Sequence, residues 1–186
     1  MLLETPRLRL RRFQATDALA LSLYRSDPAV ARYQGWTAPV PLDEAVQLVR
    51  EFGVGEPDLP GWFQYAVELK EDGALIGDVG VGLHDNLMQA DLGYTLASGR
   101  QRRGYATEAV RAVLRDLFQR QGLRRVSAVC DARNERSARL LERAGFVLEG
   151  ERPAFTWAKG EWTDDLLYGL LAARWGAWEA AEAPDG

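Results

Sequence analysis

The predicted order of strands and helices changes near residue 98, and this change constrains the fold most strongly. Before it, three stretches with the residue types of strands follow one another, and Gly73 lies at a turn of hairpin length between the first two. After it, helix and strand alternate. Hairpins make antiparallel neighbours, whereas a strand–helix–strand unit makes parallel ones. We therefore expect an α+β fold with a mixed sheet.

The other elements follow from hydrophobic periodicity and from the positions of glycine and proline. The length of 186 residues indicates one domain, to which we assign residues 1–178, with a flexible tail over residues 179–186. In chain order we predict a strand at 7–11, helices at 16–25 and 42–52, strands at 62–69, 75–83 and 90–97, a helix from Gly104 to Gly122, a strand at 125–130, a helix from Asn134 to Gly145, and strands at 152–158 and 162–170.

Composition argues against several classes of protein. The net charge of −4 speaks against a general nucleic-acid binder, and no run of about 18 apolar residues exists to span a membrane. A single cysteine, Cys130, excludes an intrachain disulfide. The single histidine, His84, stands in no metal-ligand spacing with that cysteine, so we expect no metal site. The N-terminus lacks the pattern of a signal peptide, and we expect a cytoplasmic protein.

The segment from Ser98 to Ala106 joins a predicted strand to a predicted helix and is rich in glycine, arginine and small residues. The start of a helix presents unpaired N–H groups and about half a positive charge, which attract an anion such as a pyrophosphate. Gly104 permits close approach of the backbone, and Arg102 and Arg103 add charge. The alternative is a helix that begins at a glycine and carries solvated arginines.

A second helix is predicted to begin after a strand, at Asn134. Asparagine is a common N-cap residue, and Ser137 lies one turn later on nearly the same face of the helix. From these two residues alone, a capped helix start with an ordinary polar residue in its first turn explains the pattern.

Taken together, these segments resemble the GNAT superfamily of N-acetyltransferases, and within it the branch that acetylates the N-termini of ribosomal proteins. The resemblance covers about residues 3–175, and its pieces come in the order and spacing of the family. They are Leu3-Glu4-Thr5-Pro6-Arg7-Leu8-Arg9-Leu10, Ala90-Asp91-Leu92-Gly93-Tyr94, Gln101-x-x-Gly104-x-Ala106, Asn134-x-x-Ser137 followed by Ala144-Gly145-Phe146, and Gly160-Glu161-Trp162 with Asp164.

The resemblance implies a mostly antiparallel sheet of six or seven strands, flanked by about four helices. The strands at 90–97 and 125–131 are implied to splay apart and to hold the pantetheine arm of acetyl-CoA, which would be the co-substrate, without a metal. The adenosine end is assigned to Arg143 or to its neighbour Arg139. The residues implied to bind acetyl-CoA are Leu96, Ala97, Ser98, Arg102, Arg103, Gly104, Tyr105, Ala106, Thr107, Asn134 and Arg143.

Acetyl transfer requires a neutral amine, a donor for the thioester oxygen and a proton for the departing thiolate. Many family members supply that proton from a tyrosine, but the matching residue here is Leu141, and the resemblance to the branch implies Ser137 instead. Some branch members carry a glutamate where this chain has Thr156, which is no base at neutral pH. Asp91 is our first candidate for the base; Glu68, Asp78, His84 and a water relay without a dedicated base are the alternatives.

The interpretation of the whole sequence is an acyltransferase that moves an acetyl group from acetyl-CoA to a primary amine by direct attack. The acceptor is a protein N-terminus or a small-molecule amine, and the resemblance implies a homodimer. The alternative is a non-catalytic module that binds acyl-CoA and serves regulation. The aromatic residues expected either at the acceptor pocket or in the core are Tyr33, Trp36, Trp62 and Phe63.

Overall fold

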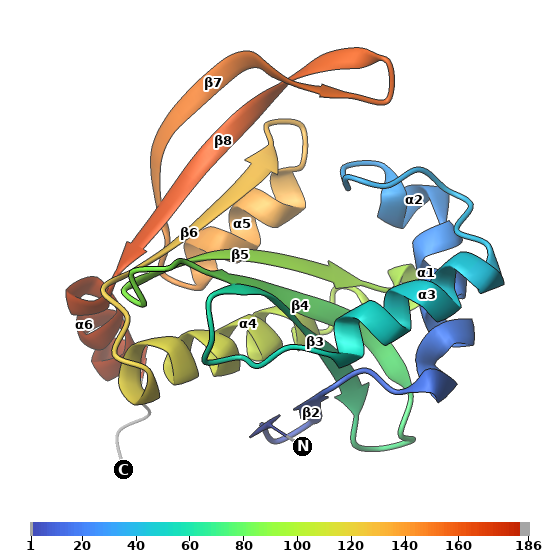
Figure 1. The fold of residues 1–186 in the computed structure, drawn as a ribbon. Helices are drawn as coiled ribbons and strands as arrows, with labels where there is room; N and C mark the ends of the chain where they lie inside the picture. The colour runs from blue at the N-terminus through green and yellow to red at the C-terminus, as the bar shows by residue number, and fades with distance from the viewer. Residues whose placement is uncertain (1, 183–186) are drawn as a thin grey trace.

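The structure, a computed structural model, describes residues 2–182, with side chains through residue 179. Eight strands form one sheet in the order β1-β2-β3-β4-β5-β6-β8-β7, and only β5 and β6 are parallel neighbours (Figure 1). The predicted α+β class and mixed sheet are confirmed. The strands are β1 (Leu3–Glu4), β2 (Leu8–Arg11), β3 (Gly61–Leu69), β4 (Leu75–Leu83), β5 (Gln89–Leu96), β6 (Arg125–Asp131), β7 (Val147–Ala158) and β8 (Glu161–Leu171).

The described residues contain more elements than the sequence predicted, with eight strands instead of six or seven. Six α-helices replace the expected four or so. The additions are β1, α2 and α6. Two of them are very short, and α2 depends on the side chain of Asp27, which accepts a hydrogen bond from the N–H of Ala29. The helices are α1 (Ala18–Ser26), α2 (Pro28–Ala31), α3 (Leu42–Gly53), α4 (Tyr105–Arg115), α5 (Glu135–Arg143) and α6 (Ala172–Glu182).

Helix α6 occupies part of the segment that was predicted as a tail. Its Trp175 is buried and stacks on Phe118, with the ring centroids 5.9 Å apart. Glu179 forms an ion pair with Arg115 of α4 at 2.7 Å. Packing of this kind stabilises a helix whose own sequence gives only a weak signal. The predicted boundary at residue 179 therefore falls inside α6, and residues 183–186 lie outside the described part of the chain.

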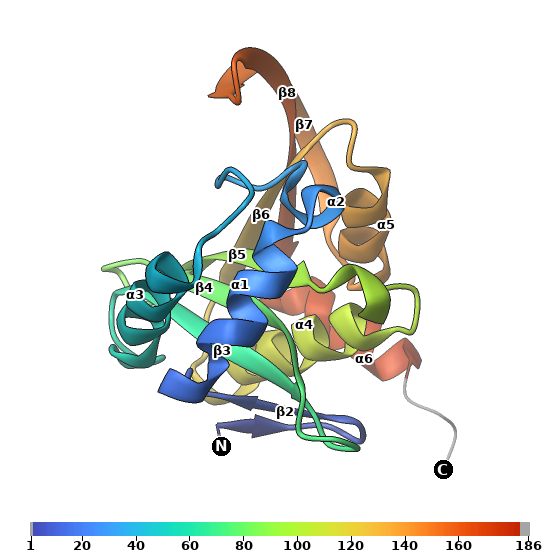
Figure 2. The same cartoon turned by 90° about the vertical axis from the view of Figure 1, so that its right-hand side faces the viewer.

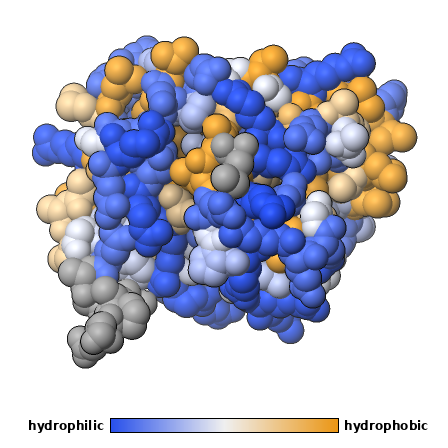
Figure 3. Space-filling view, turned by 90° about the horizontal axis from the view of Figure 1, so that it is seen from below, coloured by the Kyte–Doolittle hydropathy of each residue, from blue (hydrophilic) through white to orange (hydrophobic). Residues whose placement is uncertain are grey.

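Two apolar layers cover the two faces of the sheet. Residues of α4, α5 and α6 contribute to one layer, and residues of α1 and α3 form the other with part of β3. Figure 2 shows α3 on one side of the strands and α4, α5 and α6 on the other. Seen from below, the face that carries β2 and α4 is mainly hydrophilic (Figure 3).

Strands β5 and β6 separate after a short paired segment. Their ladder covers only Gln89–Asp91 against Arg125–Ser127. The rest of β5 continues to pair with β4, while the rest of β6 pairs with β8. The predicted splay between these two strands is therefore present, and it exposes the facing edges of both strands to whatever lies between them.

The β7–β8 hairpin extends beyond the end of β6. Strand β6 pairs with Asp165–Leu171 of β8, so the first four residues of β8 and their partners in β7 overhang the sheet. Figure 1 shows this hairpin arching above β6 on the side where α2 also lies. The overhang brings the turn at Lys159 within reach of the end of α2.

Candidate active site

A cavity of about 890 Å³, the larger cavity, lies where the unpaired end of β5 meets the starts of α4 and α5. It brings together the segment at residues 29–34, the end of β5 and the starts of α4 and α5, which are far apart in the chain. The predicted site residues that line it are Leu96, Arg102, Gly104, Tyr105, Ala106, Thr107, Asn134, Ser137 and Arg143; Arg139 lines it as well.

Three residues predicted to bind acetyl-CoA do not line the larger cavity. The N–H of Ala97 donates to the carbonyl oxygen of Ile76 at 2.9 Å, which keeps Ala97 in the β4–β5 pairing. The side chain of Ser98 is hydrogen-bonded to Asp27. The carbonyl oxygen of Arg103 accepts a hydrogen bond from Nη1 of Arg7 at 2.9 Å.

The start of α4 has the geometry of an anion site. Gly104 is the N-cap residue with φ of 81°, and no side chain caps the helix. A Cβ at Gly104 would lie 3.2 Å from Nη2 of Arg7, so this position favours glycine for space as well as for its positive φ. The first N–H groups of α4 and the guanidinium of Arg102 face the same cavity. These features fit a pyrophosphate.

Residues between β1 and β2 hold the start of α4 in place, a support that the sequence did not reveal. Glu108 accepts hydrogen bonds from Oγ1 of Thr5 at 2.6 Å and from the backbone N–H of Arg7 at 3.0 Å. The guanidinium of Arg7 pairs with the same carboxylate and lies 4.5 Å from the ring centroid of Tyr105. Burial would raise the pKa of Glu108, but the hydrogen bonds from Thr5 and Arg7 outweigh it and lower that pKa.

Three polar side chains meet inside the splay. The hydroxyl oxygen of Tyr94, on β5, lies 2.7 Å from Oγ of Ser137, on α5. The thiol of Cys130, on β6, lies near the same serine side chain, and burial raises its pKa to about 11. Asn134 accepts a hydrogen bond from the N–H of Ser137 at 3.2 Å. It is therefore the N-cap of α5, as its residue type and position predicted. Sequence reasoning gave no role to Tyr94, although its segment carried the resemblance.

The predicted base candidates lie elsewhere. Asp91 belongs to the paired end of β5, and its side chain is 57% exposed and lies 3.0 Å from Nε2 of His84. Glu68 is engaged by arginines of β2, and Asp78 is buried against the hydroxyl of Tyr24. None of these four residues lines the larger cavity. Whether a side chain reaches the cavity depends on its position along the strand and on the face of the sheet that it occupies. Residue type alone reveals neither.

A second cavity of about 210 Å³, the smaller cavity, lies under the overhanging hairpin and shares Arg32, Tyr33, Gln34 and Arg133 with the larger one. Of the four aromatic residues expected here, only Tyr33 lines these two cavities. Phe63 is buried in the core, and Trp36 packs on Arg25, whose guanidinium carbon lies 4.2 Å from the Trp36 ring centroid. The walls of the two cavities therefore contain more charged and polar side chains than the sequence suggested.

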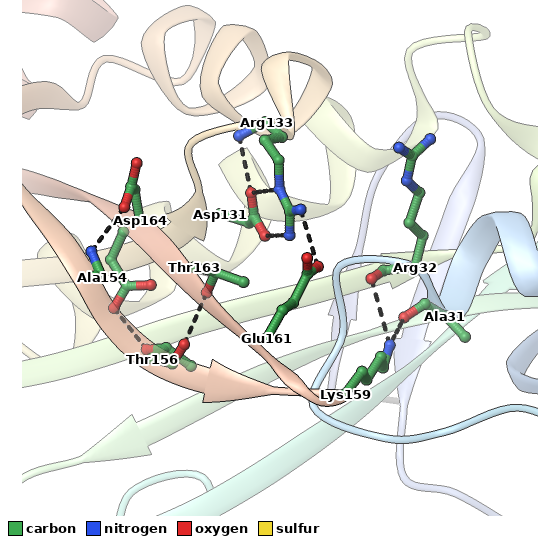
Figure 4. A network of polar contacts seen from close by, with 11 residues as sticks. Ala31, Arg32, Asp131, Arg133, Ala154, Thr156, Lys159, Glu161, Thr163 and Asp164 are labelled. Atoms are coloured by element: carbon green, nitrogen blue, oxygen red, sulfur yellow. Dashed lines mark hydrogen bonds and ion pairs between the residues drawn. The ribbon is translucent and has the colours of Figure 1, made fainter.

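Two carboxylates around the smaller cavity, those of Asp131 and Glu161, pair with the same arginine (Figure 4). Arg133 lies between Asp131, at 2.7 Å, and Glu161, at 2.9 Å. Lys159 reaches from the hairpin turn to the carbonyl oxygens of Ala31, at the end of α2, and of Arg32, the latter at 3.4 Å. These contacts tie the hairpin to α2 across the smaller cavity.

Thr156 and Asp165 also line the smaller cavity. Oγ1 of Thr156 donates to Oδ2 of Asp165 at 2.8 Å, and Nη2 of Arg152 lies 3.0 Å from the same oxygen. Thr156 stands where some branch members carry a glutamate, and the neighbouring strand supplies a carboxylate, Asp165, that is already paired with Arg152.

Two further observations concern metals and membranes. Among residues 2–182, no group of three or more His, Cys, Asp or Glu side chains is arranged to hold a metal ion. No helix in the described part of the chain combines the length and the apolar character that crossing a membrane requires.

A mixed sheet whose parallel strands part beside two helix starts defines the class of protein as an acetyltransferase fold. Comparison with known proteins agrees: a model of the acetyltransferase (GNAT) domain matches residues 7–147. The chain belongs to the GNAT acetyltransferase family and is an acyltransferase enzyme, as the sequence predicted.

Relatives are consistent with this assignment. The chain is 30% identical over 174 residues to the uncharacterized N-acetyltransferase YoaA of Bacillus subtilis (strain 168), covering 93% of this chain and 98% of that protein. It is 30% identical over 102 residues to the ribosomal protein uS5-alanine N-acetyltransferase of Escherichia coli (strain K12), covering 52% and 53%. The structure of spermidine N-acetyltransferase from Vibrio cholerae in complex with CoA and spermine superposes with a TM-score of 0.78 at 19% identity, covering 92% of this chain and 99% of that one.

Proposed function

We propose that this enzyme transfers an acetyl group from acetyl-CoA to a primary amine by direct attack. The observation that carries the proposal is the larger cavity, which joins an uncapped helix start, a row of arginines and the open splay in one continuous space. This space suits a ligand with a phosphorylated end and a narrow, uncharged arm. A solved relative of the same fold contains CoA, which supports this choice of donor.

Each part of the donor site has a task in this proposal. The N–H groups at the start of α4, with Gly104 and Arg102, bind the pyrophosphate. The edge of β5 from Tyr94 to Leu96 lies along the arm. Ser137 stands in the splay, where the sulfur leaves, and supplies the proton that the departing thiolate needs.

The smaller cavity holds the acceptor in this proposal. It adjoins the larger cavity through Tyr33 and Arg133, and Cys130 in its wall contacts Ser137. An amine in the smaller cavity therefore reaches the acetyl group from the side of β6 and the β7–β8 hairpin. The primary amine is either a protein N-terminus or a small molecule, since relatives of both kinds exist.

Each carboxylate of the smaller cavity is paired with an arginine. Hydrogen bonds from Arg133 lower the pKa of Asp131, Glu161 shares that arginine, and Arg152 is paired with Asp165. We propose that the amine loses its proton to water and that no side chain acts as a dedicated base. This choice replaces Asp91, which lies at the closed end of the splay.

The proposal is tested by incubating the full chain with acetyl-CoA and a panel of amines, and by measuring free thiol together with the mass of the product. We expect thiol release that depends on the amine, with a product heavier by one acetyl group. Tight binding of acetyl-CoA with no transfer to any amine would favour the alternative, a non-catalytic module that binds acyl-CoA. The homodimer and the cytoplasmic location stay predictions.

A further inference from the structure

The hydroxyl of Ser137, in the splay, is held by neighbouring polar groups. Oγ of Ser137 contacts the hydroxyl of Tyr94 at 2.7 Å and the thiol of Cys130, so three elements, β5, β6 and α5, converge on one atom. Its backbone N–H is held by Asn134. The backbone and the side chain of Ser137 are therefore both anchored.

Tyr94 reaches Ser137 at two atoms. A serine hydroxyl has one proton and two lone pairs, whereas a neutral tyrosine and a neutral thiol each have one proton to donate. The hydroxyl of Tyr94 donates to the carbonyl oxygen of Ser137 at 3.2 Å and also lies 2.7 Å from its Oγ, where either oxygen can be the donor. One tyrosine hydroxyl therefore fixes both the backbone and the side chain of Ser137, and both residues line the larger cavity.

Both neighbours keep their protons at neutral pH. Burial raises the pKa of Tyr94, and burial raises the pKa of Cys130 to about 11. Neither group therefore competes with Ser137 as an anion.

We infer that Tyr94 is a positioning residue that holds Oγ of Ser137 at the place where the sulfur departs. The inference rests on the proposed function, because the sulfur is that of the acetyl donor. The amine nitrogen forms a bond to the acyl carbon, and the carbon–sulfur bond breaks with its electron pair going to sulfur. Ser137 gives its proton to that sulfur, the amine loses one proton to water, and Ser137 regains a proton from water after the thiol has left.

The test compares steady-state rates of Tyr94→Phe, Ser137→Ala and the double variant with those of the wild type. We expect Tyr94→Phe to lower kcat about tenfold, the size of one lost hydrogen bond, with KM for acetyl-CoA changed less than about twofold. Ser137→Ala should lower kcat about 100-fold, the usual size for a lost general acid. Adding Tyr94→Phe to Ser137→Ala should change nothing further, because the tyrosine acts only through the serine.

A matched control distinguishes this role from the loss of a buried hydroxyl in general. Tyr168 is buried, its hydroxyl lies 3.2 Å from Oε1 of Glu142, and it does not line the larger cavity. We expect Tyr168→Phe to keep kcat within about twofold of the wild type. Cys130→Ala should give a smaller loss than Tyr94→Phe, since a thiol is a weak donor.

The outcomes separate the inference from the proposed function. No transfer by the wild type to any amine means that the proposed function fails. An active wild type with kcat unchanged in a folded Tyr94→Phe variant overturns the inference alone. So do losses that multiply in the double variant, or a loss as large in Tyr168→Phe. Thermal melting and calorimetric acetyl-CoA affinity establish that each variant is folded with an intact larger cavity.

Discussion

The larger and the smaller cavity are assembled from different kinds of segment. The larger cavity uses the starts of two helices, where unpaired N–H groups come with the local sequence. The smaller cavity is closed by a contact between Lys159 and the end of α2, about 128 residues earlier in the chain. Sequence motifs therefore predict the larger cavity, whereas the smaller cavity exists only because the β7–β8 hairpin overhangs the sheet.

The largest expected effect is a loss of acetyl-CoA affinity at the larger cavity. Gly104→Glu adds a side chain at φ of 81°, against Arg7, and brings a carboxylate toward the phosphates. We expect acetyl-CoA affinity, measured by calorimetry, to fall by more than about 100-fold. Gly99→Glu adds the same charge at an exposed glycine with free space around it, and should bind almost normally. If a folded Gly104→Glu variant binds acetyl-CoA as tightly as the wild type, the pyrophosphate does not bind at the start of α4.

The pH dependence tests the absence of a dedicated base near the smaller cavity. Only the neutral amine attacks, so kcat/KM should rise about tenfold per pH unit until the pKa of the acceptor itself. Acceptors with an α-amine, whose pKa is about 8, should level off roughly two units below alkylamines, whose pKa is about 10. Stopped assays across pH 6 to 10 with both kinds of acceptor measure this, with the range chosen around those pKa values. An inflection at one common pH for both acceptors would reveal a base on the protein.

A smaller effect is expected from weakening the contacts that hold the start of α4 beside the larger cavity. Glu108→Gln weakens the bonds from Thr5 and Arg7, and we expect it to lower the free energy of unfolding by about 1 kcal/mol at neutral pH.

The lowered pKa of Glu108 determines how this contribution to the free energy of unfolding changes with pH. Its contribution is complete above the unfolded value of about 4.3 and is lost as the pH falls through the lower folded value. Denaturant titrations of both proteins at neutral and acidic pH should therefore converge at low pH. Glu4→Gln, in an exposed pair with Lys70, is the control and should cost less. A difference between wild type and Glu108→Gln that persists at the lowest pH would show that the charge is irrelevant.

The smallest effect concerns the tie over the smaller cavity. Lys159→Met keeps the apolar stem and removes the bonds to the carbonyls of Ala31 and Arg32, so we expect KM for the acceptor to rise about threefold while acetyl-CoA affinity holds. The chain has one other lysine, Lys70, at the opposite edge of the sheet, and Lys70→Met is the matched control. A rise in the KM for acetyl-CoA instead of the KM for the acceptor would show that the contact between Lys159 and α2 supports the acetyl-CoA site and not the acceptor site.

Local residue patterns by themselves determined the α+β class, the mixed sheet, the order of the long elements and the loop before α4. Gly104, the arginines beside it and Asn134 express local backbone chemistry, and local chemistry is visible in a single segment. Weak or very short elements were missed: α6 gains its stability from Trp175 in the core, and β1 has two residues.

Only the tertiary structure decided which polar side chains meet. Asp91 and Tyr94 are three residues apart on one strand, yet Asp91 is exposed beside His84 whereas Tyr94 touches Ser137 in the splay. Successive strand residues point to opposite faces, and the β5–β6 ladder ends between these two positions. The place where a ladder ends depends on packing across the whole sheet, and no local pattern around residue 91 contains it.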